Sequence, residues 1–251
     1  VKVDFMERND AEMVEFYHRV AREAAARKML VNFHSSYPAD GLHALYPNVM
    51  TREGVIGLEY NKWSERATPT HNLIIPYLRQ WASGMDYTPG SMVNTQKKFF
   101  RVRHDGPMSI GTRCHHMAMY VVYESPLQML SDSPSKYDMS PEWFPYLETV
   151  PTVWDETVPL WGTIGENLAV ARRKDQTWFV GAMISGDAVQ KNIDLSFLPE
   201  GEWEVTLWKD GVNADKNAVD FKTENYTVTS ESIIAVDFAP NGGCTAILKR
   251  L

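Results

Sequence analysis

Two acidic residues in the first quarter of the chain stand at the ends of short apolar segments. Asp4 lies in the sequence Val-Lys-Val-Asp-Phe-Met at residues 1–6, and Glu59 follows the apolar residues 55–58. Two carboxylates at the ends of two barrel strands form the kind of site that cleavage of a glycosidic bond needs. One carboxylate attacks the sugar or activates water, and the other protonates the departing oxygen. The sequence therefore predicts a glycoside-cleaving site built on Asp4 and Glu59.

Two basic residues lie close to these acids in the predicted arrangement. Lys2 precedes Asp4 by two residues and so shares its strand face, where we expect it to bind a sugar hydroxyl and to keep Asp4 ionised. The alternative is a buried pair in which Lys2 and Asp4 merely satisfy each other. His34 ends the apolar segment 30–33, a position that suits a packed core histidine and a residue that hydrogen-bonds substrate equally well.

The segment that follows Glu59 contains two aromatic residues. Tyr60 and Trp63 could form a surface on which a sugar ring stacks, although aromatic side chains more often belong to a core. A buried Glu59 beside these rings would stay protonated and act as a general acid. The alternative is an ordinary glutamate in a salt bridge with Lys62. Asp86 ends another short segment and is followed by a turn, which repeats the order of strand, acid and turn.

The elements that must position these residues follow a strand, helix and strand order. Residues 1–6 and 30–33 are predicted strands, and apolar residues at helical spacing run between them from Asn9, the expected N-cap, to about Lys28. This order is typical of a parallel crossover unit, and therefore of an α/β barrel. Further strands are predicted at 55–58, 85–86 and 127–130, and further helices at 71–81, 114–123 and 142–147.

The pattern changes near residue 150. Short alternating segments follow, separated by turns of Gly, Asp, Asn and Pro. They lie at residues 168–172, 178–183, 193–197, 203–208, 226–229, 233–238 and 245–248. Lys209-Asp210-Gly211 is a hairpin signal between two of them. We expect a second, all-antiparallel domain that is most simply a small sandwich. Because it holds no histidine and no convincing pair of acids, its predicted role is structural.

Bulk composition limits the remaining functions. The chain has 251 residues and 44% hydrophobic residues, which is enough for a sizeable core. A net charge of -7 without any basic run argues against nucleic acid. No apolar run approaches the roughly 18 to 20 residues of a membrane span, so no membrane partner is expected.

Cys114 and Cys244 are predicted to be separate buried thiols. Because the chain begins without Met inside a predicted strand, we expect it to be the latter part of a longer protein.

Short motifs along nearly the whole chain resemble one enzyme family. They are Lys-Val-Asp-Phe-Met at 2–6, Tyr-Pro-Asn at 46–48, Arg-Glu-Gly at 52–54, Gly-Leu-Glu-Tyr-Asn-Lys-Trp at 57–63, Met-Asp-Tyr-Thr-Pro-Gly at 85–90 and Tyr-Glu-Ser-Pro-Leu-Gln-Met-Leu at 123–130. Their order and number are similar to family 97 of the glycoside hydrolases, which includes alpha-galactosidases and alpha-glucosidases of polysaccharide-degrading bacteria. That family combines an N-terminal β-sandwich, a catalytic (β/α)8 barrel and a C-terminal β domain.

The resemblance implies that the chain starts at about the fourth barrel strand. Residues 1–150 would then be the C-terminal part of the (β/α)8 barrel, and residues 151–251 an all-β antiparallel sandwich domain. A barrel needs all eight strands to close, so the N-terminal part of the parent protein is needed to complete it. Strand 1–6 is therefore expected to leave an apolar edge exposed. The resemblance also implies a periplasmic or secreted location.

The same resemblance assigns roles to residues. Retaining members of the family place the nucleophile at the aspartate of a Lys-x-Asp-Phe strand, here Asp4, and the acid/base at the glutamate of Gly-x-Glu-Tyr, here Glu59. Inverting members carry a base glutamate just after the histidine of the next strand, where this chain has Ser35. This implies a retaining enzyme for alpha-galactosides, with carboxyls about 5 to 5.5 Å apart. Glu53 matches a glutamate that ligates calcium in the family, an ion that prefers oxygen ligands.

The expected partner is an oligosaccharide or glycoside substrate. Its expected binding residues are Lys2, His34, Asp86 and Trp63. One alternative is an inverting alpha-glucosidase of the same family, and another is a non-catalytic carbohydrate-binding fragment, because half a barrel can be inactive even if its parent is an enzyme. A third is a metal-dependent barrel hydrolase with His34, Asp86 and either His115 or His116 as ligands. That third hypothesis leaves the paired carboxylates unexplained.

Overall fold

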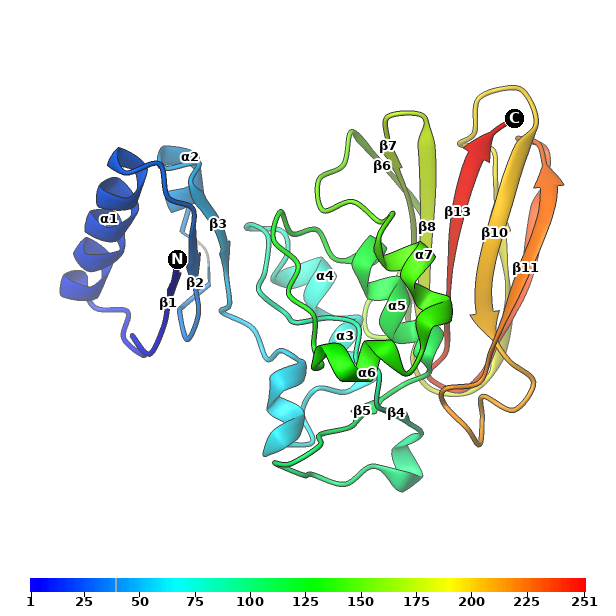
Figure 1. The fold of residues 1–251 in the computed structure, drawn as a ribbon, viewed down its shortest axis with the longest axis horizontal. Helices are drawn as coiled ribbons and strands as arrows, with labels where there is room; N and C mark the ends of the chain where they lie inside the picture. The colour runs from blue at the N-terminus through cyan, green and yellow to red at the C-terminus, as the bar shows by residue number, and fades with distance from the viewer. Residues whose placement is uncertain (39) are drawn as a thin grey trace.

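The computed structural model describes residues 1–38 and 40–251. Its N-terminal part is a parallel sheet of three strands in the order β1-β2-β3, which are Lys2–Val3, Val31–Phe33 and Val49–Arg52 (Figure 1). Met85 pairs in parallel with Arg52 and extends this sheet by one bridge. Helix α1 (Ala11–Ala26) connects β1 to β2 and covers the sheet, with the rings of Tyr17 and Phe33 at 4.6 Å between centroids. The predicted parallel crossover unit is confirmed.

The outer edge of this sheet is open. Strand β1 pairs with β2 alone among the described residues, and the side chains of Val1 and Phe5 beside it are 50% and 81% exposed. The predicted apolar edge is therefore confirmed. The part of a barrel that this chain supplies thus ends at β1 with an unpaired strand edge, the kind of edge that a further strand can cover.

Helices, most of them short, and a two-stranded sheet of β4 and β5 make up the rest of the chain before the C-terminal part, with α2 between β2 and β3. They are α2 (Leu42–Leu45), η1 (Leu58–Lys62), α3 (Pro69–Asn72), α4 (Ile75–Leu78), β4 (Asn94–Thr95), η2 (Lys97–Phe99), β5 (Ser109–Ile110), α5 (Arg113–Val122), α6 (Pro134–Asp138), η3 (Pro141–Trp143) and α7 (Phe144–Leu147). Every residue of α5 is buried, because the helix packs against the C-terminal sheet on one side and against the short helices on the other (Figure 1). The side chain of Thr112 caps α5 by accepting the N–H of His115 at 3.1 Å.

The C-terminal part is a two-layer β-sandwich. Six antiparallel strands form one sheet in the order β11-β10-β13-β8-β7-β6, and β12 and β9 form the second. Their bounds are β6 (Glu156–Thr163), β7 (Asn167–Lys174), β8 (Thr177–Ile184), β9 (Val189–Asp194), β10 (Trp203–Asp210), β11 (Phe221–Val228), β12 (Ile233–Phe238) and β13 (Gly243–Arg250). One apolar core lies between the two sheets, and a second lies between the large sheet and α5. Because both faces of β8 are covered, it reads as a nearly continuous apolar run.

Several predicted elements differ from the structure. Residues 55–58 are not a strand: the strand is β3, which ends at Arg52 because its partners β2 and Met85 end there, and the apolar residues beyond it pack as a loop. Residues 127–130 form no strand, and Gln128 instead donates a side-chain hydrogen bond to the carbonyl of Tyr123 at 2.9 Å. Strand β6 was not predicted.

Two further sequence expectations concern the cysteines and membrane spans. Cys114 and Cys244 are both buried and unpaired, as the apolar patterns around them predict. Among the helices of residues 1–38 and 40–251, none is both long and apolar enough to cross a membrane.

Candidate active site

A cleft of about 790 Å³ opens where the parallel strands end. Asp4, His34 and Glu53 are each the first residue after β1, β2 and β3, and Asp86 directly follows Met85 on the next parallel segment. Because parallel strands end at the same edge of a sheet, these four side chains come from four neighbouring strand ends. The predicted residues that line the cleft are Lys2, Asp4, His34, Glu53, Glu59 and Trp63. Asp86 is not among the lining residues.

Asp4 sits in a setting that favours its charged form. Partial burial raises its pKa, but a hydrogen bond from the Ser35 side chain, the Phe5 N–H at 2.7 Å and the nearby charges of His34 and Lys2 together lower the pKa of Asp4 below its usual value. The Lys2 ammonium lies 3.8 Å from Asp4 Oδ2. The residues thus supply an ionised carboxylate at the cleft, which a nucleophile requires.

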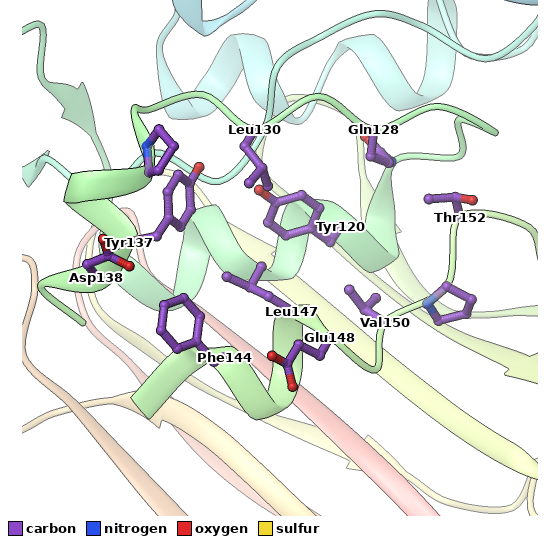
Figure 2. A pocket seen from close by; sticks show the side chains of 12 residues that line it. Tyr120, Gln128, Leu130, Tyr137, Asp138, Phe144, Leu147, Glu148, Val150 and Thr152 are labelled. Carbon is purple, nitrogen blue, oxygen red and sulfur yellow. The ribbon is translucent and has the colours of Figure 1, made fainter. Parts of the chain in front are cut away.

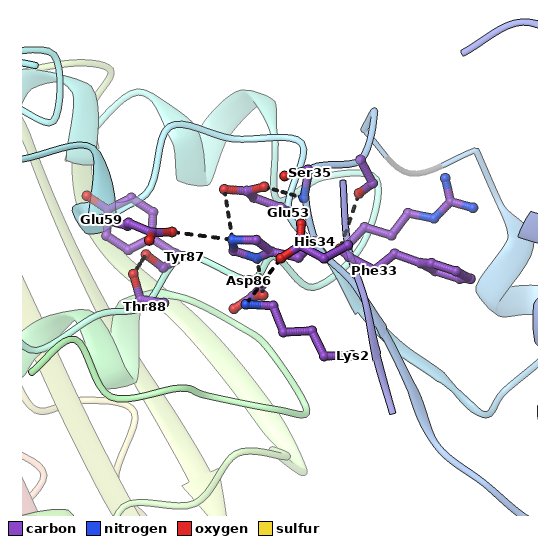
Figure 3. A network of polar contacts seen from close by, with 12 residues as sticks. Lys2, Phe33, His34, Ser35, Glu53, Glu59, Asp86, Tyr87 and Thr88 are labelled. Carbon is purple, nitrogen blue, oxygen red and sulfur yellow. Dashed lines mark hydrogen bonds and ion pairs between the residues drawn. The ribbon is translucent and has the colours of Figure 1, made fainter. Parts of the chain in front are cut away.

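Glu59 occupies the first turn of η1 and lies between His34, whose contact with it Figure 3 shows, and Lys62. Its Oε2 is 3.5 Å from His34 Nε2, and its Oε1 is 3.3 Å from the Lys62 ammonium. The side chain is 40% exposed, so the burial expected for Glu59 is wrong and the alternative of a salt bridge with Lys62 is present. Glu59 nevertheless lines the same cleft as Asp4.

The ring of His34 is hydrogen-bonded to Asp86 on its side away from the cleft. Its Nδ1 lies 2.8 Å from Asp86 Oδ2 (Figure 3), and the same oxygen accepts the Asn32 side-chain N–H at 3.0 Å. The hydrogen bond to Asp86 raises the pKa of His34 more than burial lowers it, and the charge of Glu53 acts in the same direction as Asp86. His34 is therefore neither of the two predicted types alone: it is anchored in the core and also lines the cleft.

Glu53 is the most enclosed acid of the cleft. Its Oε2 accepts the backbone N–H of Ser35 at 2.6 Å, and its Oε1 lies 3.5 Å from His34 Nε2. Burial raises its pKa, although the hydrogen bond from Ser35 and the charge of His34 oppose that effect. The sequence analysis noted Ser35 only as the position where inverting relatives carry a glutamate. In the structure its backbone N–H donates to Glu53 and its hydroxyl donates to Asp4.

Glu53 lines the cleft and offers carboxylate oxygens of the kind that calcium prefers. Across residues 1–38 and 40–251, however, no group of three or more His, Cys, Asp or Glu side chains has an arrangement that could hold a metal ion. Further oxygen ligands would have to come from outside this set.

Trp63 and Tyr60 lie at one edge of the cleft beyond Glu59. Their ring centroids are 5.5 Å apart at an interplanar angle of 57°, and Trp63 is 53% exposed. Both rings line the cleft and neither belongs to a buried core. An exposed aromatic pair beside a polar cleft offers an apolar face to a ligand.

His115 and His116 do not join this site. Both are fully buried in α5. His115 Nδ1 donates to the Gly242 carbonyl at 3.2 Å, which leaves Nε2 as the acceptor of the Asn72 side-chain N–H at 3.1 Å. Burial lowers the pKa of His115 to about 4, so its ring is neutral. The metal-dependent hydrolase hypothesis therefore lacks its ligand set in the described part of the chain.

A second cavity of about 360 Å³ lies between α5, α6 and α7 (Figure 2). Its wall is mostly apolar, with Tyr120, Leu130, Phe144 and Leu147 among the side chains that line it. None of the predicted site residues contributes to it. Without converging acids and bases this cavity does not compete with the cleft as a candidate active site.

Comparisons with known proteins agree with the fold and the cleft. A family described as "Glycoside hydrolase 97" matches residues 1–55, and one described as "Glycosyl-hydrolase 97 C-terminal, oligomerisation" matches residues 153–249. The chain is 41% identical over 250 residues to a protein of Bacteroides thetaiotaomicron named retaining alpha-galactosidase. It is 31% identical over 247 residues to a probable retaining alpha-galactosidase of Streptomyces bingchenggensis.

These matches cover 99% and 98% of this chain but 38% and 36% of the two relatives, so the chain spans less than two fifths of their length. Among solved structures, a glycoside hydrolase family 97 enzyme from Pseudoalteromonas sp. strain K8 in complex with panose superimposes with a TM-score of 0.86 at 31% identity, over 95% of this chain and 37% of that one. A beta-arabinopyranosidase shares the fold with a TM-score of 0.84 at 22% identity, over 98% of this chain and 38% of that one. Part of a barrel with a cleft lined by acids, followed by a β-sandwich, is the architecture that this chain shares with the Pseudoalteromonas glycoside hydrolase. The chain belongs to glycoside hydrolase family 97, as its motifs predict.

Proposed function

We propose that this chain supplies both catalytic carboxylates of a retaining glycoside hydrolase that acts on alpha-galactosides. The observation that carries the proposal is the shared cleft of Asp4 and Glu59, in which Asp4 is held ionised. The names of the two curated relatives support the retaining mechanism and the alpha-galactoside substrate. The presence of Ser35, where an inverting member would carry its base, points in the same direction.

The reaction proceeds in two displacements. Asp4 attacks the anomeric carbon while Glu59 donates its proton to the glycosidic oxygen, so one carbon–oxygen bond forms and one breaks. Glu59, now a carboxylate, then takes a proton from water, and the water oxygen displaces Asp4 from the anomeric carbon. Both steps invert the anomeric centre, so the product keeps the configuration of the substrate. The carboxyl groups of Asp4 and Glu59 are expected about 5 to 5.5 Å apart.

Substrate contacts follow from the position of each side chain around the two acids. Lys2 and His34 face the cleft near Asp4, where Lys2 donates to a hydroxyl of the sugar that is cleaved off and His34 Nε2 accepts from one. Trp63 and Tyr60 follow Glu59, which protonates the leaving oxygen, so they flank the leaving group. An aromatic surface on that side suits the apolar face of a second sugar.

Calcium is proposed as the cofactor, with Glu53 as the ligand that this chain contributes. When bound, the ion would supply positive charge beside the general acid. Glu53→Gln removes one ligand and is expected to weaken calcium binding measured by titration calorimetry on the chain completed to the length of its relatives. Equal calcium affinity in that variant and in the unaltered protein would contradict the assignment.

Partners and location follow from the relatives. Completion of the barrel requires the additional length that the relatives have, and the description of the C-terminal family as an oligomerisation domain supports association of the β-sandwich with a second copy. A periplasmic or secreted location is proposed from the resemblance to enzymes of polysaccharide-degrading bacteria.

Nitrophenyl glycosides test the activity directly. In the chain completed to the length of its relatives, we expect nitrophenol release from the alpha-galactoside in preference to the alpha-glucoside. Asp4→Asn should lower kcat by roughly 10³-fold or more, because the nucleophile is lost. Glu59→Gln should lower it by roughly 10² to 10⁴-fold, because a general acid contributes about that much.

Asp10→Asn is the matched control, because it makes the same change at an exposed acid outside the cleft that asparagine can replace as a helix cap. Its activity should equal that of the unaltered protein. Full activity in Asp4→Asn would exclude the nucleophile. An initial product of inverted configuration, seen by NMR, would favour the inverting alternative, and absence of any hydrolysis would favour a carbohydrate-binding role.

A further inference from the structure

We propose that Asp86 is a positioning residue that fixes the ring of His34 in one tautomer and one orientation, so that Nε2 of His34 stays against the acid/base Glu59. This inference rests on the function proposed above, which assigns Glu59. From the sequence, Asp86 is expected to bind substrate. The buried location of Asp86 in the structure gives it a different role.

Asp86 is buried beneath the cleft. The residue is 2% exposed and does not line the cleft, and its own backbone N–H donates to the Arg52 carbonyl at 3.0 Å. Its side chain is therefore fixed to the strand next to β3. A substrate in the cleft meets His34 first, and Asp86 reaches the reacting groups only through that ring (Figure 3).

The partners of Asp86 determine the tautomer of His34. Asn32 Nδ2 lies 3.0 Å from Asp86 Oδ2 and 2.5 Å from Thr51 Oγ1. A reversed amide would place the oxygen of Asn32 against the carboxylate, so Asn32 donates and Asp86 Oδ2 accepts. The same oxygen lies 2.8 Å from His34 Nδ1 and accepts there too, so that Nδ1 carries the proton.

Sheet geometry explains why these groups meet. Asn32, Thr51 and Asp86 come from three neighbouring parallel strands and form one polar layer inside the sheet. His34 is two residues beyond Asn32, so its side chain points to the same face one level nearer the cleft. Asp86 therefore lies directly below the ring that it holds.

The opposite edge of the ring faces the two glutamates. His34 Nε2 is 3.5 Å from Glu53 Oε1 and 3.5 Å from Glu59 Oε2. The other oxygen of Glu59 is 3.3 Å from the Lys62 ammonium, so Glu59 stands between two basic groups. With the proton on Nδ1, Nε2 of His34 is an acceptor for the proton that Glu59 carries as general acid. Loss of Asp86 would free the ring of His34 to rotate and would remove this contact, which leaves Glu59 beside Lys62 alone.

The test combines kinetics with NMR on the chain completed to the length of its relatives. Asp86→Ala is expected to lower kcat for a nitrophenyl alpha-galactoside on the order of 10- to 100-fold, by analogy with the loss of a carboxylate behind a metal-binding histidine, with KM little changed. Asp86→Asn retains an oxygen that can accept from His34 and should fall between Asp86→Ala and the unaltered protein. Asp210→Asn alters a buried aspartate of the C-terminal sheet and should keep the kcat of the unaltered protein.

Nitrogen-15 chemical shifts of the His34 ring report which nitrogen carries the proton. A merely structural role of Asp86 would leave that property unchanged in the variant. In the unaltered protein we expect the proton on Nδ1, and in Asp86→Ala a mixture of tautomers. A raised KM with unchanged kcat, unchanged kinetics, or a neutral ring protonated on Nε2 in the unaltered protein would overturn the inference. If Asp86→Ala fails to fold, the tautomer of His34 in the unaltered protein decides whether the inference stands.

Failure of this inference is distinct from failure of the proposed function. Inactive Asp4→Asn and Glu59→Gln variants together with an Asp86→Ala variant of normal kcat would leave the glycosidase intact and remove only the role of Asp86. Full activity in Asp4→Asn would instead remove the proposed mechanism, whatever the tautomer of His34.

Discussion

Asp210 is an acid whose burial links folding to pH. It ends β10, and its Oδ2 accepts the N–H groups of Ala239 and Gly243 at 3.0 and 3.1 Å. Burial raises its pKa from 3.8 to about 7, although these hydrogen bonds and one from Thr112 oppose the shift. The folded protein therefore holds a proton at Asp210 that the unfolded chain releases between about pH 4 and 7. Its contribution to stability is complete below about pH 4 and is lost as the pH rises through 7.

Asp210→Asn should remove this pH dependence, since an amide does not ionise. We expect the melting temperature of the variant minus that of the unaltered protein to be larger at pH 8 than at pH 5. The corresponding change in the difference of unfolding free energy is on the order of 1 to a few kcal/mol. Thermal unfolding followed by circular dichroism at the two pH values measures it. Parallel melting curves at both values would contradict a raised pKa at Asp210.

At the scale of elements, helix α1 shows which of two candidate residues caps it. The sequence favours Asn9, but in the structure Asp10 has extended backbone, its side chain accepts the Met13 N–H at 3.1 Å, and Arg8 donates to it at 2.7 Å. The prediction that Asn9 is the cap is therefore wrong. Adjacent Asn and Asp are equally good caps, and the exact start of the helix depends on contacts outside it.

Asp10→Ala is expected to lower the free energy of unfolding by about 1 kcal/mol, the usual cost of losing a cap, whereas Asn9→Ala should change it little. Asp10→Asn keeps a capping side chain and should be nearly neutral. Urea unfolding of the three variants measures these differences. A larger loss in Asn9→Ala than in Asp10→Ala would restore the cap that the sequence favours.

At the scale of the whole molecule, α5 joins the barrel part to the sandwich. A Cβ atom at Gly181 of β8 would lie 2.8 Å from Val121 Cβ and 2.9 Å from the Ala118 carbonyl oxygen, both on α5. Neither atom is the flexible end of a side chain, so the helix or the sheet would have to shift. Gly181→Ala should therefore destabilise the protein by about 1 to 3 kcal/mol, seen as a lower melting temperature. An unchanged melting temperature would mean that α5 docks less closely than described.

The same junction connects the site to the C-terminal sheet. Tyr87, which follows Asp86, donates its hydroxyl to the Asn72 side chain, and Asn72 donates to His115 at 3.1 Å. His115 in turn donates to the carbonyl of Gly242 at 3.2 Å. Burial raises the pKa of Tyr87 far above its usual value, so its hydroxyl stays a donor. The sandwich therefore does more than cover α5. Through these hydrogen bonds it also fixes the segment that carries Asp86.

Patterns along the sequence were sufficient for the parts of the fold that local periodicity controls. Helix α1, helix α5 and most strands of the sandwich follow the predicted spacing of apolar residues, and the order of strand, helix and strand implies the parallel unit. Strand β6 escaped prediction because Pro159 and Gly162 interrupt its pattern, and such residues are tolerated on an edge strand. The apolar run 55–58 was mistaken for a strand because loop residues can also pack into a core.

Chemistry at the strand ends was also visible in the sequence. Asp4, His34 and Asp86 were each predicted at the end of a short strand, and residue type with position is enough to place such groups at one edge of a parallel sheet. Glu53 was singled out by the resemblance alone, because the strand that it follows was predicted at 55–58 instead. The tertiary structure alone decided which of them face the cleft and which hold another residue. Asp86 lies below His34 and Glu59 remains partly exposed beside Lys62, because burial and pairing arise from neighbouring strands that no local pattern encodes.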